Sequence, residues 1–189
     1  MDIIRVRYDK GRKILVADSV NWAGVGLTFL ADDIFYTSKR LSGITGVYIL
    51  VAYEPVIMEG KQFTDSIVYI GESVQLYARI QSQMGSLCLR YGQDFRWERI
   101  YAFYGADNRL TGTHALHLEH RLLHLAQGRC TLKNDKINEG EPGGSNELTT
   151  REAEMFLVNL IEAAKLLGIN FLEQTPKEKD KNRDKGKFR

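Results

Sequence analysis

Runs of apolar residues in the middle of the chain predict the strands of a sheet. Residues 46–53, Gly-Val-Tyr-Ile-Leu-Val-Ala-Tyr, are nearly all apolar, and a run without alternation is typical of a central strand covered on both faces. Residues 66–70 predict a second strand. Residues 54–65, which contain a proline and a glycine, predict an extended hairpin loop between the two. Residues 97–104 alternate and are rich in aromatic side chains, so they predict a third strand.

Apolar residues at helical spacing predict three helices farther along the chain. The first follows the second strand and gives way to a loop or frayed helix over residues 85–95, and the second runs to about Gln127. The third keeps its apolar spacing up to Leu167, and Gly168 stops it. Hydroxyl side chains, which favour helix N-termini, stand at the predicted starts: Ser73, Thr113, and Thr149 in a capping box with Glu152.

The N-terminal residues predict a small extension. Residues 3–8 and 13–17 are short runs typical of strands, joined by a turn at residues 9–12. Residues 21–24 predict a loop, and residues 31–40 predict a short helix or turn. A piece of about 40 residues is too small to hold a core of its own, so we expect it to pack on the next part of the chain.

Together these elements predict an α+β fold with a small central antiparallel β-sheet of about three strands flanked by helices, preceded by an N-terminal β-hairpin extension. The predicted division of the chain has four parts. The extension covers residues 1–42, the central unit covers residues 43–135, and a loop with a C-terminal helix that packs on the core covers residues 136–175. Residues 176–189 are charged and almost without apolar side chains, which predicts a disordered tail.

Composition changes this picture little. Hydrophobic residues make up 43% of the 189 and charged residues 26%, as in ordinary soluble globular chains. An apolar run of about 18 residues is missing, so we expect no membrane span, and the N-terminus lacks the pattern of a secretory signal. Cys88 and Cys130 make neither a disulfide framework nor a zinc motif, and a cytoplasmic protein is the natural expectation.

Charge is distributed unevenly around a net value of +2. Residues 71–136 hold nine basic and six acidic side chains, and residues 177–189 hold seven and three. Residues 137–176, in contrast, hold two basic and seven acidic side chains. The basic excess therefore lies in the middle of the chain and in the tail, which suits a phosphate-bearing partner such as DNA.

Four side chains carry groups that phosphodiester hydrolysis requires. Glu119 falls inside the apolar arc of its helix, where a carboxylate needs a partner or a metal ion, and a carboxylate is a ligand suited to Mg²⁺. Arg79 offers a planar cation that matches phosphate oxygens. Tyr48 and Tyr69 stand on neighbouring predicted strands. Plainer interpretations remain open: cross-strand aromatics, a solvated arginine, and a glutamate that reaches water at the edge of the arc.

One set of residues resembles the motifs of the GIY-YIG nuclease superfamily: Gly46-Val47-Tyr48, then Tyr69-Ile70-Gly71, Arg79, Glu119 and, more weakly, Asn134. The resemblance covers roughly residues 43–135. It implies cleavage of DNA phosphodiester bonds with a divalent metal ion, Mg²⁺ or Mn²⁺.

The resemblance also implies a role for each residue. Glu119 would hold the metal ion, Arg79 would bind the scissile phosphate, and Tyr69 would help position water or substrate. Tyr48 would act as general base toward the attacking water. A phenol with a pKa near 10 is a poor base at neutral pH, so either cationic neighbours lower that pKa or the metal ion activates the water. Asn134 would lie near the metal ion and the phosphate, or it forms a turn.

Gln83 departs from the family's pattern. Members often place a His or Tyr one helical turn after the arginine, where it touches the phosphate or the leaving group. Gln83 occupies that substrate-binding position but carries no charge and is no acid. Either another residue substitutes or the reaction is slower, and the available substitutes are His114, His117, Tyr101 and Tyr104.

His120 and His124 lie four residues apart, as do the two histidines of a zinc-protease helix. The order His-Glu-x-x-His is missing, however, and no cysteine pair accompanies them. The sequence therefore favours a polar helix face that also carries His117 and Arg121.

The leading hypothesis from the sequence is a metal-dependent DNA endonuclease of GIY-YIG type. The alternative is a nucleic-acid-binding or regulatory module with little or no cleavage, motivated by Gln83 and the long loop at residues 54–65. A third hypothesis is a structural role in which the tail at residues 176–189 recruits a protein partner. DNA target and oligomeric state stay open, because the sequence offers no helix-turn-helix or zinc finger.

Overall fold

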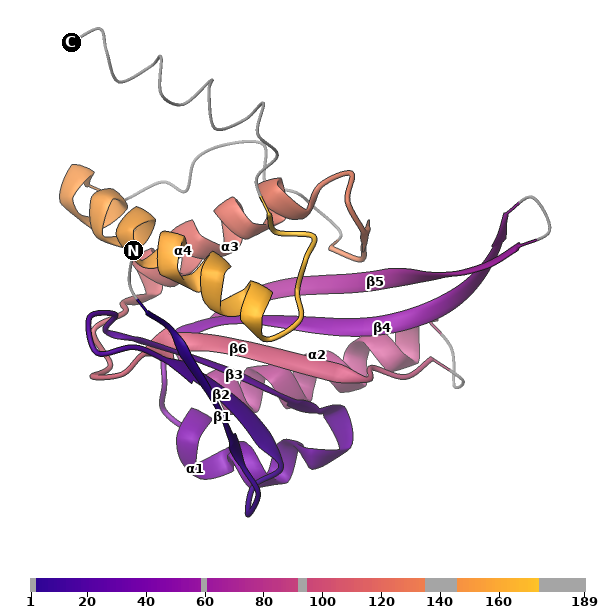
Figure 1. The fold of residues 1–189 in the computed structure, drawn as a ribbon, viewed down its shortest axis with the longest axis horizontal. Helices are drawn as coiled ribbons and strands as arrows, with labels where there is room; N and C mark the ends of the chain where they lie inside the picture. The colour runs from indigo at the N-terminus through magenta and orange to yellow at the C-terminus, as the bar shows by residue number, and fades with distance from the viewer. Residues whose placement is uncertain (1–2, 59–60, 92–94, 135–145, 174–189) are drawn as a thin grey trace, which may run out of the picture.

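A computed structural model gives the fold of the chain and describes residues 3–58, 61–91, 95–134 and 146–173, without the side chains of residues 55–64. The charged tail at residues 176–189 and most of the predicted loop before the C-terminal helix lie outside the described residues. The chain forms an α+β arrangement in which three strands precede the first helix and helices are interspersed among the later strands (Figure 1).

The sheet has seven strands in the order β1-β2-β3-β6-β4-β5-β7, so the predicted small sheet of about three strands is wrong. All neighbours are antiparallel except β5 and β7, which pair in parallel and make the sheet mixed. The strands are β1 (Arg5–Asp9), β2 (Ile14–Asp18), β3 (Gly24–Leu30), β4 (Gly46–Met58), β5 (Lys61–Ser73), β6 (Arg99–Gly105) and β7 (Thr131–Leu132).

Strand β3 joins the N-terminal hairpin to the rest of the sheet, because it pairs with β2 on one side and with β6 on the other. The sequence did not predict it, since glycine is disfavoured in strands. The structure gives a reason for both glycines. A Cβ at Gly24 would come within 2.1 Å of the Trp22 indole, and one at Gly26 would lie 3.0 Å from the Phe103 ring. Gly24 thus leaves room for the indole of Trp22, two residues earlier, and Gly26 leaves room for Phe103 on the neighbouring strand β6. Strand propensity reveals neither contact.

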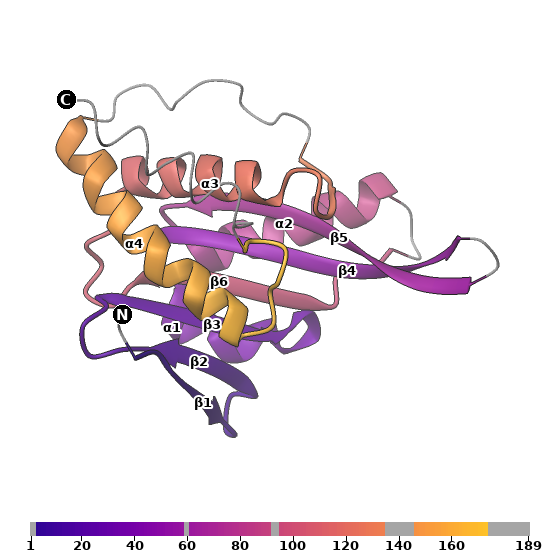
Figure 2. The same cartoon turned by 45° about the horizontal axis from the view of Figure 1, so that its top comes forward.

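The predicted loop at residues 54–65 is also wrong, because β4 and β5 continue as a paired ribbon as far as Met58 and Lys61. This ribbon projects from the body of the molecule (Figures 1 and 2). The pairing of β4 with β6 ends at Val51, so Pro55 falls where the sheet has narrowed to the β4–β5 pair. Proline is tolerated at strand edges, and it therefore does not end β4.

Helices cover both faces of the sheet (Figures 1 and 2). Two lie on one face, α3 (Gly112–Ala126) and α4 (Glu147–Leu166), and the other face carries η1 (Ala31–Thr37), α1 (Ser38–Leu41) and α2 (Leu76–Tyr91).

The helix boundaries agree in part with the prediction. Gly168, with φ at +104°, follows the end of α4 as predicted. The predicted caps Thr113 and Thr149 are wrong. In the structure Thr111 caps α3 in a reciprocal capping box with His114, and Asn146 caps α4 by accepting a 2.8 Å hydrogen bond from the Thr149 amide. Thr111 and Asn146 precede the predicted caps in the chain, and both have extended backbone conformations. In this conformation their side chains can reach the free amides of the first helical turn.

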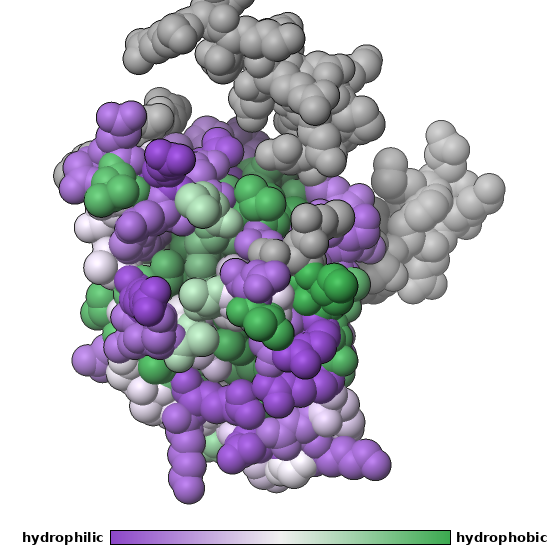
Figure 3. Space-filling model, turned by 60° about the vertical axis from the view of Figure 1, so that its left-hand side comes forward, coloured by the Kyte–Doolittle hydropathy of each residue, from purple (hydrophilic) through white to green (hydrophobic). Residues whose placement is uncertain are grey.

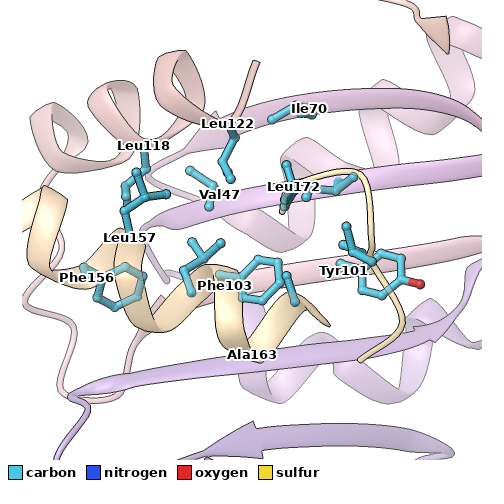
Figure 4. Close-up of a cluster of buried hydrophobic side chains, with 14 of the residues drawn as sticks. Val47, Ile70, Tyr101, Phe103, Leu118, Leu122, Phe156, Leu157, Ala163 and Leu172 are labelled. Atoms are coloured by element: carbon cyan, nitrogen blue, oxygen red, sulfur yellow. The ribbon is translucent and has the colours of Figure 1, made fainter. Parts of the chain in front are cut away.

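Alternation along β4 explains why this strand is buried on both faces, as predicted. Val47 and Ile49 point into the core beneath α3 and α4, whereas Tyr48 and Leu50 point into the core beneath α1 and α2. Figure 4 shows the first of these cores, where Phe103 of β6, Leu118 and Leu122 of α3 and Leu157 of α4 close around Val47.

The histidines of α3 correct another prediction. His114, His117 and His120 are buried rather than on a solvated polar face. His114 and His117 contact Glu152 and Glu154 of α4, at 3.1 and 2.7 Å, because α4 packs over this side of α3.

On the face drawn in Figure 3, hydrophilic residues and apolar patches are mixed. Within the described part of the chain, none of the helices combines the length and apolar character that a bilayer crossing requires.

Candidate active site

The two glycines of the sequence motifs are required by close packing. Tyr48 pairs with Gly71 across β4 and β5, and its ring lies over that glycine. A Cβ at Gly71 would come within 2.5 Å of the Tyr48 hydroxyl oxygen, and one at Gly46 would lie 2.2 Å from the Phe103 carbonyl oxygen. The glycines therefore let β4, β5 and β6 approach around a buried tyrosine.

The two motif tyrosines lie on the same face of the sheet. Tyr69 pairs with Leu50, two residues from Tyr48, and the two phenol rings have centroids 6.2 Å apart at an interplanar angle of 31°. Tyr48 is fully buried, and the Arg79 guanidinium group lies close enough to act on its hydroxyl, although the geometry falls short of a well-formed hydrogen bond. Burial raises the pKa of Tyr48 far above its ordinary value, the nearby Tyr69 adds to that shift, and the charge of Arg79 opposes it.

Side chains form hydrogen bonds with the backbone groups at the outer edge of β5, beyond the point where its pairing with β7 ends. The Asn134 side chain accepts a 3.1 Å hydrogen bond from the Ile70 amide and donates a 2.7 Å hydrogen bond to the Ile70 carbonyl. The next outward-facing amide, that of Glu72, donates to the carboxylate of Glu119 on α3. An amide and a carboxylate thus take the place of another strand.

Glu119 is an unusual carboxylate in electrostatic terms. Burial raises the pKa of Glu119 to about 7, and repulsion from Glu72 contributes to the increase. Arg79 and the hydrogen bond from the Glu72 backbone act in the opposite direction. The pKa of Glu72 is also raised by burial, with Arg79 again opposing the shift. Two carboxyl groups and one guanidinium group therefore share a single partly buried region.

A cleft of about 410 Å³ opens beside these groups, between β5, α2 and α3. Four of the residues predicted for the site line it together, and they share its wall with three residues of α2 that were not predicted. The lining residues are Tyr69, Gln83, Ser86, Leu87, Arg90, Glu119 and Asn134.

The remaining predicted residues lie next to this cleft. Tyr48 is buried close to Tyr69, and Arg79 is exposed at a position where its charge acts on Tyr48, Glu72 and Glu119. The structure therefore brings Tyr48, Tyr69, Arg79 and Glu119 into one neighbourhood.

The suggested substitutes for a family His or Tyr lie elsewhere. His114 and His117 contact glutamates of α4, and Tyr101 belongs to the core beneath α3 and α4 (Figure 4). Tyr104 lies beside Arg40. None of these four lines the cleft at Gln83.

Sequence reasoning missed Glu72, Ser86 and Arg90. Glu72 could have been noticed because it follows the Tyr-Ile-Gly motif directly. Ser86 and Arg90 lie three and seven residues after Gln83, which places all three on one face of a helix. The sequence predicted loop or frayed helix over residues 85–95, so that face was not continued as far as Arg90.

The donor set fits a hard divalent cation better than zinc. Over the described parts of the chain, the structure contains no cluster of three or more His, Cys, Asp or Glu side chains arranged for a metal ion. Mg²⁺ typically takes one or two carboxylates and keeps several waters, and Glu119 with the nearby Glu72 offers that number. A cation would also stabilise the ionised carboxylates that burial disfavours.

Comparison of this chain with family models, with curated proteins and with solved structures finds no match. What the protein does is therefore inferred from the residues of the cleft and from their chemistry.

Proposed function

We propose that this protein is a metal-dependent DNA endonuclease of GIY-YIG type that hydrolyses phosphodiester bonds. One observation supports the proposal most strongly. Tyr69 and Glu119 line one cleft, and Tyr48 and Arg79 lie next to it, although these side chains come from β4, β5, α2 and α3 and span some seventy residues of chain. Core packing alone does not require a carboxylate, a guanidinium group and two phenols to gather beside an open cleft.

In this proposal Glu119 holds the Mg²⁺ or Mn²⁺ ion, with Glu72 close by. A divalent cation supplies Lewis-acid activation of water and neutralises charge on the phosphate. Arg79 binds a phosphate oxygen of the scissile group with its planar fork. Its exposure leaves the guanidinium group open to a ligand that arrives from solution.

Tyr48 acts as a neutral hydroxyl in the resting protein rather than as a ready general base, because its raised pKa keeps the proton in place. Its hydroxyl is buried beside the Arg79 side chain, so Tyr48 acts on the substrate through that arginine, whereas Tyr69 lines the cleft itself. We therefore assign Tyr48 and Tyr69 to orienting the attacking water and the substrate. Asn134 holds β5 in place through Ile70 and so positions Tyr69.

The test is nicking of supercoiled plasmid in Mg²⁺ or Mn²⁺ by the full chain and by Glu119→Gln. We expect the variant to lose about 100-fold or more in rate, because the neutral amide is a poor ligand for the cation. Glu98→Gln, an exposed glutamate outside the cleft, is the matched control and should cut at the normal rate. Equal cutting by Glu119→Gln would remove Glu119 from the reaction.

A second candidate function follows from Gln83, which lines the cleft but cannot protonate a leaving group. It is a nucleic-acid-binding or regulatory module that performs little or no cleavage. DNA binding that persists in EDTA, with no cleavage in any divalent metal ion, would favour this function over the endonuclease.

A further inference from the structure

We propose that Arg90 forms a second phosphate-binding subsite, so that a nucleic-acid strand lies along α2 while one of its phosphates is at Arg79. This inference rests on the proposed function, because it takes the ligand of the cleft to be a nucleic acid. It adds a ligand-binding residue that the sequence motifs do not contain.

The geometry of α2 carries the inference. Gln83, Ser86 and Arg90 line the cleft, at spacings of three and four residues that keep them on one helix face. Arg79 lies four residues before Gln83 and extends the same stripe toward the N-terminus of α2. The stripe therefore begins and ends with a guanidinium group and has an amide and a hydroxyl between them.

The two arginines are too far apart to bind the same phosphate. Arg90 follows Arg79 by eleven positions of α-helix, which is about three turns and about 16 Å along the helix axis. A nucleic-acid strand places one phosphate per roughly 3.4 Å of axis, so a strand along α2 brings a different phosphate to each guanidinium group. The amide of Gln83 and the hydroxyl of Ser86 can donate hydrogen bonds to the phosphates between them.

The opposite wall of the cleft suits the rest of a nucleotide. Tyr69 of β5 offers an aromatic face there, on which a base or a sugar can pack. Glu119 repels a lone phosphate unless a cation lies between them. A polyanionic strand that is held at two arginines and bridged to Glu119 by a cation fits this distribution of charge better than a single small anion does.

Arg90 also lies in the last turn of α2, where a cation stabilises the helix C-terminus. A purely structural role would make Arg90→Ala lower the free energy of unfolding without changing DNA binding. The experiment must separate the two roles, and the fork-lacking variant Arg90→Lys helps because it keeps the charge at the helix end.

The experiment compares wild type, Arg90→Ala, Arg90→Lys and the control Arg5→Ala, an exposed arginine on β1 at the opposite edge of the sheet. Nicking kinetics and binding anisotropy are measured on a set of oligonucleotides shortened from either end, at several salt concentrations. We expect Arg90→Ala to raise KM about 10-fold with kcat nearly unchanged, and to reduce the slope of log K against log salt by about one. Arg90→Lys should recover part of the loss, and Arg5→Ala should behave as wild type.

Shortening the oligonucleotide from the end that lies at Arg90 should raise the KM of the wild type as the Arg90→Ala substitution does. The same shortening should leave the KM of Arg90→Ala unchanged. Normal KM, normal salt slope and normal length dependence in Arg90→Ala would overturn the subsite, even if Glu119→Gln is inactive and the proposed function stands. If no DNA is cut, the anisotropy series in EDTA decides the subsite alone. A reduced salt slope in Arg90→Ala then supports it, and an unchanged slope overturns it.

Discussion

At the scale of single residues, the site depends on a pair that no local pattern explains, a buried tyrosine lying over a glycine. The Tyr48 ring fills the space that a side chain at position 71 would need. Interiors are packed closely enough that one added methyl group is felt. Gly71 is therefore a steric requirement of Tyr48, and the two positions belong to one packing unit.

Gly71→Ala should destabilise the protein by about 1–3 kcal/mol, because the new Cβ forces Tyr48 or β5 to shift. Urea unfolding followed by circular dichroism measures the change in the free energy of unfolding. Gly85→Ala is the matched control. It makes the same chemical change within α2, with nothing within 4 Å of the new Cβ, and should stabilise by about 0.5–1 kcal/mol. A Gly71→Ala protein as stable as wild type would contradict the packing described.

The raised pKa of Glu119 predicts that the free energy of unfolding depends on pH, and it also gives the sign of that dependence. Its pKa is about 7 in the folded protein against 4.5 for an ordinary glutamate, so between those values the folded state binds more protons than the unfolded state. Without metal, the stabilising contribution of the protonated group is present below pH 4.5 and is lost as the pH rises to about 7. The loss is on the order of 1–3 kcal/mol.

The measurement is urea unfolding in EDTA between pH 4.5 and 8 for wild type and for Glu119→Gln, which mimics the protonated form. The two proteins share every histidine, so the difference between their curves reports Glu119 together with Glu72, whose charge acts on it. We expect wild type to lose stability relative to the variant as the pH rises, and added Mg²⁺ to reverse part of that loss in wild type alone. Parallel curves would show that Glu119 does not have a raised pKa.

At the scale of elements, α3 connects the site to the rest of the molecule. One side of the helix presents Glu119 to the edge of β5, and another side presents His117 and Arg121 to α4. Both of those side chains contact Glu154, each at 2.7 Å. A single glutamate of α4 thus pairs with two successive turns of α3 and fixes how the two helices lie against each other.

Glu154→Ala should lower the free energy of unfolding by about 1–2 kcal/mol, because it leaves the buried His117 without its hydrogen-bond partner. Glu162→Ala, in the same helix, is the control and should change stability by less than about 0.5 kcal/mol. Urea midpoints for the two variants give the comparison. Equal effects would mean that the contact between α3 and α4 does not depend on Glu154.

At the scale of the whole molecule, the sheet separates the site from the N-terminal strands. The cleft lies beside β5, near one edge of seven strands, and β1 forms the other edge. Charged side chains protect that other edge, with Arg5 and Arg7 both contacting Asp18. The ribbon of β4 and β5 projects beyond both helical layers and makes the molecule elongated in that direction (Figure 2).

Much of this fold could be predicted from local patterns. The unbroken apolar run at residues 46–53 indicated a central strand, and the apolar spacing around Leu118 and Leu157 indicated the helices that cover it. The glycine-containing strand β3, the continuation of the hairpin to Met58 and the burial of His117 were not predicted. Strand β3 and the burial of His117 depend on β6 and α4, which are distant in the chain, so no local propensity reports them. The hairpin was missed because its proline and glycine indicated a loop.

The amino-acid sequence by itself determined which residues are candidates for a site, since a carboxylate inside an apolar arc and two glycine-tyrosine motifs are local patterns. Only the tertiary structure decided their environment. Burial and the neighbouring Glu72 set the pKa of Glu119, the Tyr48 hydroxyl lost its contact with water, and Arg90 came to share a cleft with Glu119. Electrostatic energy and solvation depend on distances between groups, and those distances exist only once β5, α2 and α3 have packed together.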